Sequence, residues 1–473
     1  MPNLTTTAHP AFRRLMVAAG ILLLGATSVT AAPGIFNVRD HGARGDGLEH
    51  DTSAINDAIL ACAKAGGGQV LFPAGRYLSG TVQLKSLVTL YFDAGATLVG
   101  TTNLNHYQQP TPPAFMPEAT WGKWHRGLIV GENLENITLA GPGCIDGNQV
   151  FDPDGEERMR GPHTLVFVNC RRVAVRDLTF VDSANYAIYF QVSDDVDIRN
   201  VTFLGGWDGV HFRGAPDHPC RNVQITDCRF YTGDDAIAGR YWDHTVISGC
   251  IVNSACNGIR LIGPARRLTI HDSLFYGPGL YPHRTSNRHS MLSGILLQPG
   301  AWDATQGSLD DVLISDVTMH CLASPLGVWL KPGNTAGRIT VTGLTATGIY
   351  RAAASIESYA ETPVTNVVFR NVNLEFNGGG TAEQAQTAAR PPGVDVRSLP
   401  VWGVYARNVE RLSFEGVRLT CATDDLRPVM LATDVQRINF SDFRFTEVPA
   451  VKEPVVLKNV PVFDRKGGDP LSR

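Results

Sequence analysis

The segments GGWDGVHFRG (205–214), YTGDDAIAGRYW (231–242) and NSACNGIRLIG (253–263) decide the fold. Each has a polar or acidic residue, then a small residue, and then a β-branched residue that opens a short alternating strand. Aligning Val210, Ile237 and Ile259 as equivalent inward residues gives repeats of 27 and 22 residues. Near-equal spacing of this kind stacks equivalent positions in a coiled solenoid. The sequence therefore predicts an all-β fold, a single parallel β-helix in which each repeat forms one coil.

The same alignment gathers acidic residues that are far apart in the chain. It places Asp208, Asp235 and Asn257 in one column, with Asp234 beside it. Neighbouring strands of a sheet lie about 4.8 Å apart, so three carboxylates are expected to meet at one spot. Crowded like charges raise at least one pKa, which creates a proton donor beside an ionised base. Glycoside hydrolysis uses such a pair, and Asp208, Asp234 and Asp235 are the candidate catalytic residues.

Strand alternation also predicts which side chains point outward around this acidic centre. We extend the inward column to Ile188, Ile295 and Val328, and the outward residues then include many basic and aromatic side chains. Arginine and lysine pair with sugar carboxylates and hydroxyls, and aromatic faces pack on pyranose rings. The alternative is that these residues only balance the nearby Asp charges on an exposed sheet. The candidate substrate-binding residues are His211, Arg213, Arg240, Asn257, Arg260, Gln298, Trp329 and Lys331.

The first 32 residues predict a secretory signal peptide. Arg13 and Arg14 precede the apolar run 15–24, and small residues follow up to Ala32. This is the order of a cleavable export signal, and the run is too short to span a membrane. We expect the mature protein, residues 33–473, to be one β-helix domain that is secreted or periplasmic. The net charge of −4 argues against a nucleic-acid partner, for which a basic stripe is expected.

The cysteine pattern leaves one question open. Cys228 and Cys250 occupy equivalent places in consecutive repeats, so they either form a disulfide or stack inside as small hydrophobic residues. The sequence has no CxxC pair or clustered His–Cys spacing, and we predict no metal site.

An amphipathic helix precedes the long run of strands. Asp51 caps it, Ile55, Ala58, Ile59 and Cys62 form its apolar stripe, and 66-GGG-68 ends it. Such a helix is expected to cover the exposed end of a solenoid. The order DHGARGDG (40–47), DTSAI (51–55), GGG and FPAGRY (72–77) resembles the N-terminal cap of the pectin-degrading right-handed β-helix proteins. That group comprises the polygalacturonase-like glycoside hydrolases of family 28 and their pectate-lyase-like relatives.

The central repeats also resemble family 28. Its Gly-Asp-Asp motif is intact at 233–235, and its Asn-Thr-Asp motif keeps only Asp208. The resemblance implies that Asp234 is the general acid, that Asp208 and Asp235 activate water, and that the anomeric configuration inverts. The family's Gly-His-Gly falls on 256-CNG-258 and its Arg-Ile-Lys on 296-LLQ-298, so the supporting His and both recognition charges are missing. His211 and Arg260 are the candidate replacements.

These observations predict a cofactor-independent glycosidase that acts on a pectic or otherwise uronic-acid- or rhamnose-containing polysaccharide. A lyase or epimerase on the same scaffold is the second hypothesis, because such reactions use a basic side chain near a uronate. A non-catalytic glycan-binding solenoid is the third. The Gly-rich and Pro-rich stretch 378–397 is expected to be a flexible surface loop.

Overall fold

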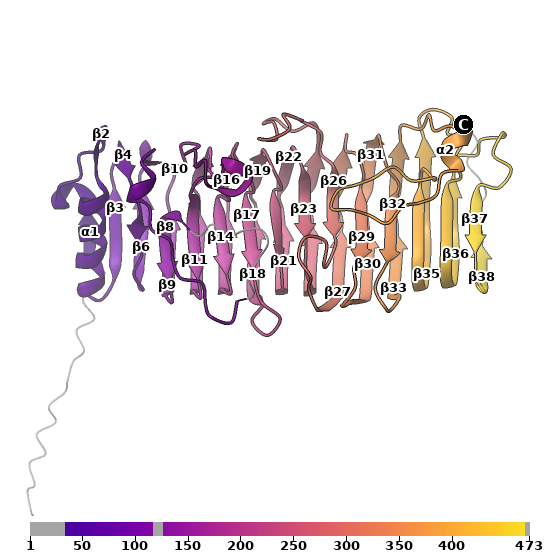
Figure 1. Ribbon diagram of the computed structural model, residues 1–473, viewed down its shortest axis with the longest axis horizontal. Coiled ribbons are helices and arrows are strands. Elements are labelled where there is room, and N and C mark those ends of the chain that lie inside the picture. Colours follow the sequence, from indigo (N-terminus) through magenta and orange to yellow (C-terminus); the bar gives the residue numbers. More distant parts are fainter. Residues whose placement is uncertain (1–33, 117–125, 469–473) are drawn as a thin grey trace, which may run out of the picture. The chain divides into compact units, whose positions relative to one another are not determined.

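The computed structural model describes residues 34–116 and 126–468, so the predicted signal peptide lies outside the described residues. The described chain is the predicted all-β, right-handed parallel β-helix (Figure 1). Each coil has three short strands, and each strand pairs in parallel with its counterpart in the next coil. Among the described residues, no helix is long and apolar enough to cross a membrane.

Three rows of strands run along the solenoid. The row that carries the site contains β8 (Gly127–Glu132), β11 (His163–Val168), β14 (Ile188–Gln191), β17 (Val210–Arg213), β20 (Ile237–Arg240), β23 (Asn257–Leu261), β26 (Ser293–Leu297), β29 (Leu326–Leu330) and β32 (Ala354–Ser358). The second row contains β9 (Glu135–Ala140), β12 (Arg171–Arg176), β15 (Asp194–Arg199), β18 (Cys220–Thr226), β21 (Trp242–Ser248), β24 (Ala265–His271), β27 (Gly307–Ser315), β30 (Asn334–Thr342) and β33 (Val364–Arg370). The third contains β10 (Cys144–Asp146), β13 (Thr179–Val181), β16 (Thr202–Leu204), β19 (Arg229–Thr232), β22 (Ile251–Ser254), β25 (Leu274–Tyr276), β28 (Thr318–His320), β31 (Thr345–Ile349) and β34 (Asn373–Phe376).

The two ends of the solenoid differ. The first coils contain β1 (Gly34–Asn37), β2 (Asp46–His50), β3 (Gly68–Phe72), β4 (Gly75–Ser79), β5 (Val82–Gln83), β6 (Val88–Phe92) and β7 (Ala96–Gly100). The last contain β35 (Val404–Cys421), β36 (Met430–Phe445), β37 (Val455–Lys458) and β38 (Val462–Lys466). The predicted helix is α1 (Thr52–Lys64), which lies at the N-terminal end of the stack (Figure 1).

Helix α1 buries the predicted stripe Ile55, Ala58, Ile59 and Cys62. Its cap differs in one respect from the expectation. Asp51 occupies the N-cap position, but its carboxylate accepts the backbone N–H groups of Arg44 and Gly45 instead of a helical N–H. The cap residue therefore ties the preceding loop to the helix start.

Inward side chains form continuous stacks through the coils. Phe180 stacks on Phe203 and Phe203 on Phe230, with ring centroids 5.4 and 4.7 Å apart. Between the second and third rows the chain turns through one residue of positive φ in each coil, as at Asn200, Asp227 and Gly249. Asn, Asp and Gly tolerate this left-handed conformation best, which explains why the repeats are punctuated by these residue types.

The open question about Cys228 and Cys250 is answered in favour of stacking. Both are buried free thiols, and all nine cysteines, which lie within the described residues, are free. The sulfur of Cys228 contacts the carbonyl of Thr226 at 3.2 Å, and that of Cys250 contacts the carbonyl of Ser248 at 3.4 Å. Each thiol thus serves its own coil as a small core residue.

The predicted register holds from β14 to β26 and then fails. Ile188, Val210, Ile237, Ile259 and Ile295 pair in succession, as the alignment requires. Ile295 then pairs with Leu326, and Val328 pairs with Leu297. The expected match of Ile295 with Val328 is wrong by two residues. Leu326, Val328 and Leu330 are all buried, so the alternating pattern fits either register equally well.

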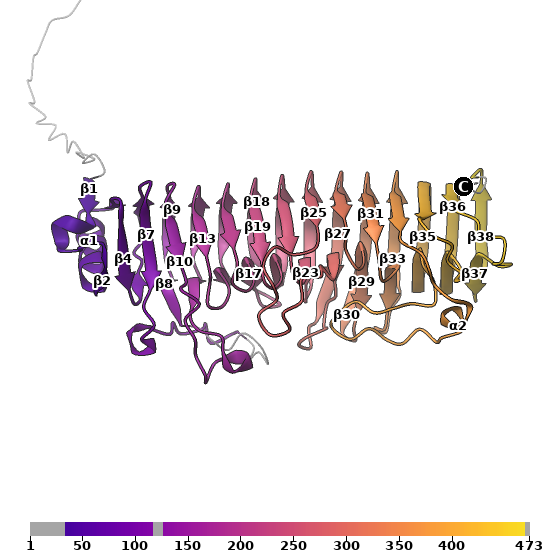
Figure 2. The ribbon, with the colours of Figure 1, turned by 90° about the horizontal axis from the view of Figure 1, so that it is seen from above.

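The stretch 378–397 is a mostly exposed segment without strands, as expected of a surface loop. It belongs to an insertion, residues 377–403, which we call the strap; it includes the short helix α2 (Ala382–Ala385). Within the strap, Arg397 makes two hydrogen bonds, at 2.9 and 2.5 Å, to the fully buried Glu357 of β32. Figure 2 shows the long insertions of the solenoid on one side of the coil stack.

Candidate active site

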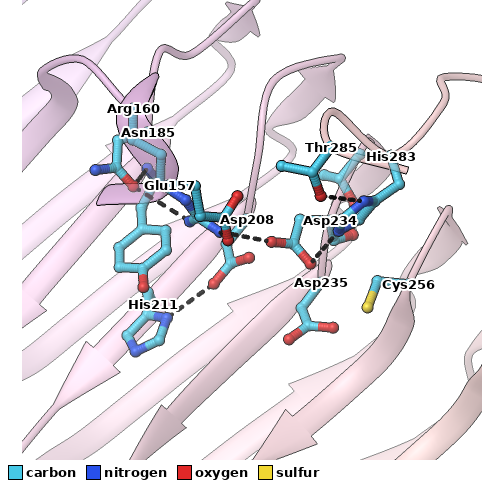
Figure 3. Close-up of polar contacts among 12 residues, drawn as sticks. Glu157, Arg160, Asn185, Asp208, His211, Asp234, Asp235, Cys256, His283 and Thr285 are labelled. Carbon is cyan, nitrogen blue, oxygen red and sulfur yellow. Dashed lines mark hydrogen bonds and ion pairs between the residues drawn. The ribbon is translucent and has the colours of Figure 1, made fainter. Parts of the chain in front are cut away.

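Three carboxylates from two consecutive coils meet in front of β17 and β20. Asp208 lies two residues before β17, and Asp234 and Asp235 lie just before β20. Val210 pairs with Ile237, so the parallel register brings the two turns side by side. One oxygen of each carboxylate lies within 4.8 Å of the others, and all three residues are buried (Figure 3). Three acids at this separation are strongly coupled in their protonation.

Asp234 is held by two residues from insertions. Nη2 of Arg160 donates to Oδ2 of Asp234 at 3.2 Å, and Nε2 of His283 lies 3.7 Å from Oδ1. Figure 3 shows these two side chains approaching Asp234 from different segments. Burial raises the pKa of Asp234, but Arg160, His283 and Arg260 outweigh that effect and hold the pKa below its ordinary value.

Asp235 is held by the next coil. Its Oδ1 accepts the backbone N–H of Asn257 at 3.0 Å and the Nδ2 of the same residue at 2.8 Å. Its Oδ2 forms an ion pair with Nε of Arg260 at 3.4 Å. Burial raises the pKa of Asp235, opposed by Arg260 and reinforced by the charge of Asp234.

Asp208 faces an aromatic wall. Its Oδ2 lies 2.8 Å from Nδ1 of His211, whose ring stacks on Tyr186 with centroids 4.2 Å apart. Burial, followed by the charges of Asp234 and Asp235, raises the pKa of Asp208 well above its ordinary value. Burial, followed by the charge of the nearby Arg240, lowers the pKa of His211 well below its ordinary value.

A cavity of about 190 Å³ opens onto the three carboxylates. Its walls come from the strand row and from four insertions, including the strap. The strap contributes Asp395, which pairs with Nη2 of Arg260 at 2.5 Å. Besides the acids, the charged lining residues are Glu156, Glu157, Arg160, Arg213, Arg240, Arg260, Arg288 and Asp395.

The structure places the predicted binding residues in two groups. His211, Arg213, Arg240 and Arg260 line the cavity, and Asn257 lies behind Asp235 as its hydrogen-bond donor. Arg240 is also paired with Asp303 of the loop after β26. These five residues surround the acidic centre.

Gln298, Trp329 and Lys331 do not line the cavity, and the expectation for them is wrong. The strap covers Trp329: Val396 lies in the same buried cluster, and the guanidinium of Arg397 lies 5.7 Å from the centre of the Trp329 ring. Trp329 is buried in a cluster with Leu296 and donates to Ser355 at 2.7 Å, and Lys331 donates to the carbonyl of Pro392. Gln298 is fully buried, and its side-chain amide has no hydrogen-bond partner among the described residues.

Sequence reasoning missed the residues that insertions bring to the site. Arg160, His283, Arg288 and Asp395 all line the cavity, yet none belongs to a strand of the repeat. The basic composition of 282-PHRTSNRH-289 was the one available signal. Repeat alignment assigns no position to an insertion, so it cannot say which coil these residues reach.

One further cluster brings together potential metal ligands. Ligand atoms of Asp234, Cys256 and His283 lie within 4.8 Å of one another, although the sequence shows no local metal-binding spacing. Nε2 of His283 faces Oδ1 of Asp234, and its Nδ1 lies 3.0 Å from the hydroxyl of Ser286 and 3.2 Å from that of Thr285.

Comparisons with known proteins bear on the fold and the family. A family model described as "Rhamnogalacturonase A/epimerase, pectate lyase-like" matches residues 35–260. A "Probable polygalacturonase" of Vitis vinifera is 27% identical over 221 residues, covering 43% of this chain and 44% of that protein. The "Plasmin and fibronectin-binding protein A" of Streptococcus pneumoniae is 32% identical over 179 residues, covering 36% of this chain and 24% of that protein. The chain thus spans less than half the length of either relative.

Among solved structures, the exopolygalacturonase of Thermotoga maritima is similar with a TM-score of 0.62. The two chains are 19% identical, and the match covers 82% of this chain and 92% of that one. At this identity the likeness shows a shared fold.

Proposed function

We propose that this chain, a member of the pectin-lyase-like right-handed β-helix superfamily related to the polygalacturonases of glycoside hydrolase family 28, hydrolyses glycosidic bonds in a polysaccharide. The proposed substrate is pectic, or otherwise contains uronic acid or rhamnose. The observation that carries the proposal is the meeting of Asp208, Asp234 and Asp235 beneath one cavity.

The arrangement supplies both halves of acid–base hydrolysis. A protonated carboxyl protonates the glycosidic oxygen, and an ionised carboxylate takes a proton from the attacking water. The opposed pKa shifts of Asp208 and Asp234 provide the two protonation states in one site. The family resemblance adds inversion of the anomeric carbon to the proposal.

The charge of the walls supports an acidic substrate. Arg213 and Arg240 occupy register-paired positions on β17 and β20, and both line the cavity. Their outward guanidinium groups suit a uronate carboxylate, since planar donors bind carboxylates well. Tyr186 and Tyr189 add aromatic side chains to the wall of the same cavity. We propose that the protein meets this polymer after export, secreted or in a periplasm.

Mass spectrometry of reaction products tests the proposal. The wild type, Asp234→Asn and the control Asp197→Asn are incubated with pectic, other acidic and neutral polysaccharides. Asp197 is an exposed residue of β15, far from the cavity lining, so its variant should keep full activity. We expect products that have gained one water per cleaved bond with the wild type and the control, and none with Asp234→Asn.

The same screen separates the alternatives. Products that lack the added water overturn hydrolysis and indicate β-elimination. Tight glycan binding by the wild type without any product overturns catalysis and indicates a binding solenoid.

A further inference from the structure

The recognition charges of the resembled family fall on 296-LLQ-298, and the structure shows these positions closed. Leu296 is fully buried in one cluster with Cys256, Leu292 and Val396 of the strap. Gln298 is fully buried as well. These positions offer neither a charge nor an open surface to a sugar carboxylate, so a group that binds one has to come from another segment.

Arg288 reaches the same place from the insertion 277–292, between β25 and β26. Its Nη2 donates to the sulfur of Cys256 at 3.0 Å, and its Nε donates to the carbonyl of Ala255 at 3.2 Å. Its Nη1 donates to the hydroxyl of Ser286 at 3.0 Å. The side chain is partly exposed and lines the cavity. The guanidinium is thus held at the cavity wall, next to the closed positions of β26.

The charge of Arg288 has no carboxylate partner among the described residues, because its three hydrogen bonds go to a carbonyl, a hydroxyl and a thiol. Three other arginines of the cavity each pair with one or two carboxylates: Arg160 with Glu157 and Asp234, Arg240 with Asp303, and Arg260 with Asp235 and Asp395. A guanidinium has five N–H groups, so each terminal nitrogen of Arg288 keeps one for a ligand. A sugar carboxylate can therefore bind there without displacing an acidic side chain of the protein.

Arg288 lies at the same edge of the strand row as the three carboxylates. The carboxylates come just before β17 and β20, and Cys256 comes just before β23, in the next coil. The sulfur of Cys256 lies within 4.8 Å of an oxygen of Asp234. Arg213 and Arg240 instead end their strands, at the other edge of the row. A sugar unit whose glycosidic bond lies at the acids can therefore place its own carboxylate beside Arg288.

We propose that Arg288 binds the carboxylate of the uronate unit that lies at the three acids, and so selects an acidic over a neutral sugar at this position. An insertion then performs the recognition that the family resemblance assigns to 296–298 of the chain. The proposal rests on the acidic substrate proposed above and not on hydrolysis, because a chain that only bound the glycan would use Arg288 in the same way.

Calorimetric binding of two matched probes tests the proposal. One probe is a set of galacturonate oligomers, and the other is the same set with its carboxyl groups methyl-esterified. Every protein in the comparison carries Asp234→Asn, so that neither probe is cleaved during the measurement. We expect Arg288→Gln to weaken binding of the acidic oligomers about 10- to 100-fold, which is the usual contribution of a hydrogen bond to a charged group. Binding of the esterified oligomers should stay the same.

Two further variants separate the charge of Arg288 from its place in the fold. Arg284→Gln is the matched control, since Arg284 lies in the same insertion and does not line the cavity. It should change the affinity for neither probe. Arg288→Lys keeps the positive charge but not the planar fork of donors, so it should recover part of the lost affinity for the acidic oligomers.

Three results would overturn the proposal. An equal loss of affinity for both probes in Arg288→Gln would show that Arg288 only holds the insertion against Ala255 and Cys256. Unchanged affinity of Arg288→Gln for the acidic oligomers would show that another group binds the carboxylate. A starting chain that binds the acidic oligomers no more tightly than the esterified ones would show that the site makes no such choice. The proposed hydrolysis fails separately, if the product screen finds no cleavage by the wild type while the effect of Arg288→Gln on binding remains.

Discussion

Removing Arg397 should release the strap without unfolding the solenoid. Glu357 is fully buried, and both its oxygens are held by Arg397, with Tyr359 donating a further hydrogen bond at 2.9 Å. Breaking a buried ion pair by removing one partner costs about 3–5 kcal/mol, because the remaining charge has no partner. The strap can open and let water reach Glu357, which limits the cost to the free energy of local opening.

Hydrogen exchange followed by mass spectrometry measures this opening. In Arg397→Met the amides of residues 381–397 should exchange up to about 10²- to 4 × 10³-fold faster, which is the rate equivalent of about 3–5 kcal/mol. The amides of β29 and β32 should change little. Arg338→Met is the control, because its ion pair with Asp311 is exposed and such pairs contribute at most about 1 kcal/mol. If the strap amides of Arg397→Met keep their protection from exchange, or if both variants lose protection equally, the Arg397–Glu357 pair does not hold the strap in place.

Four further predictions follow from single features. Phe203→Ala, which breaks the inner aromatic stack, should lower the free energy of unfolding in urea by about 3–5 kcal/mol, whereas Leu313→Ala at a partly exposed site should cost much less. The folded-state pKa of Asp208 is raised, so the folded chain holds a proton that the unfolded chain releases, and stability falls as pH rises above the unfolded value of about 3.9. Asp208→Asn removes this titration, so thermal melts should show a variant more stable than the wild type at pH 8, with no gain in stability at pH 3. Because Asp208 is a proposed catalytic residue, the variant should also be inactive. Burial raises the pKa of the Cys256 thiol well above its ordinary value, so mass spectrometry should find it unmodified by iodoacetamide at pH 7 in the folded protein and modified after denaturation. Proton NMR during turnover should show a first product of inverted anomeric configuration, and retention would contradict that part of the proposal.

The strand core could be predicted from the sequence because alternation along a strand depends only on neighbouring residues. Alternation fixes which face a residue points to, and the register of Val210, Ile237 and Ile259 then follows from their spacing. The predicted column of Asp208, Asp235 and Asn257 depends only on that register. The same rule could not fix the partner of Ile295, because a slip of two residues preserves alternation and leaves the core pattern unchanged.

The positions of the insertions could not be predicted in the same way. Arg160 contacts Asp234 across 74 residues of sequence, and nothing in the repeat pattern sets how far its loop folds back. The strap shows the same limit. Its glycines and prolines correctly predict an exposed, irregular backbone, but they give no sign of the ion pair of Arg397 with the buried Glu357 that anchors it.

The three carboxylates lie just before two neighbouring strands of one row, whereas two of the groups that act on Asp234, Arg160 and His283, lie on separate insertions. Evolution can therefore change the surroundings of Asp234 by exchanging surface segments, while the strands that form the core stay the same. Laboratory selection has the same route: libraries confined to those residues of 147–162 and 277–292 that lie outside the core would vary the working pH of the site. In this architecture, segments that tune the site are separate from the coils that determine folding.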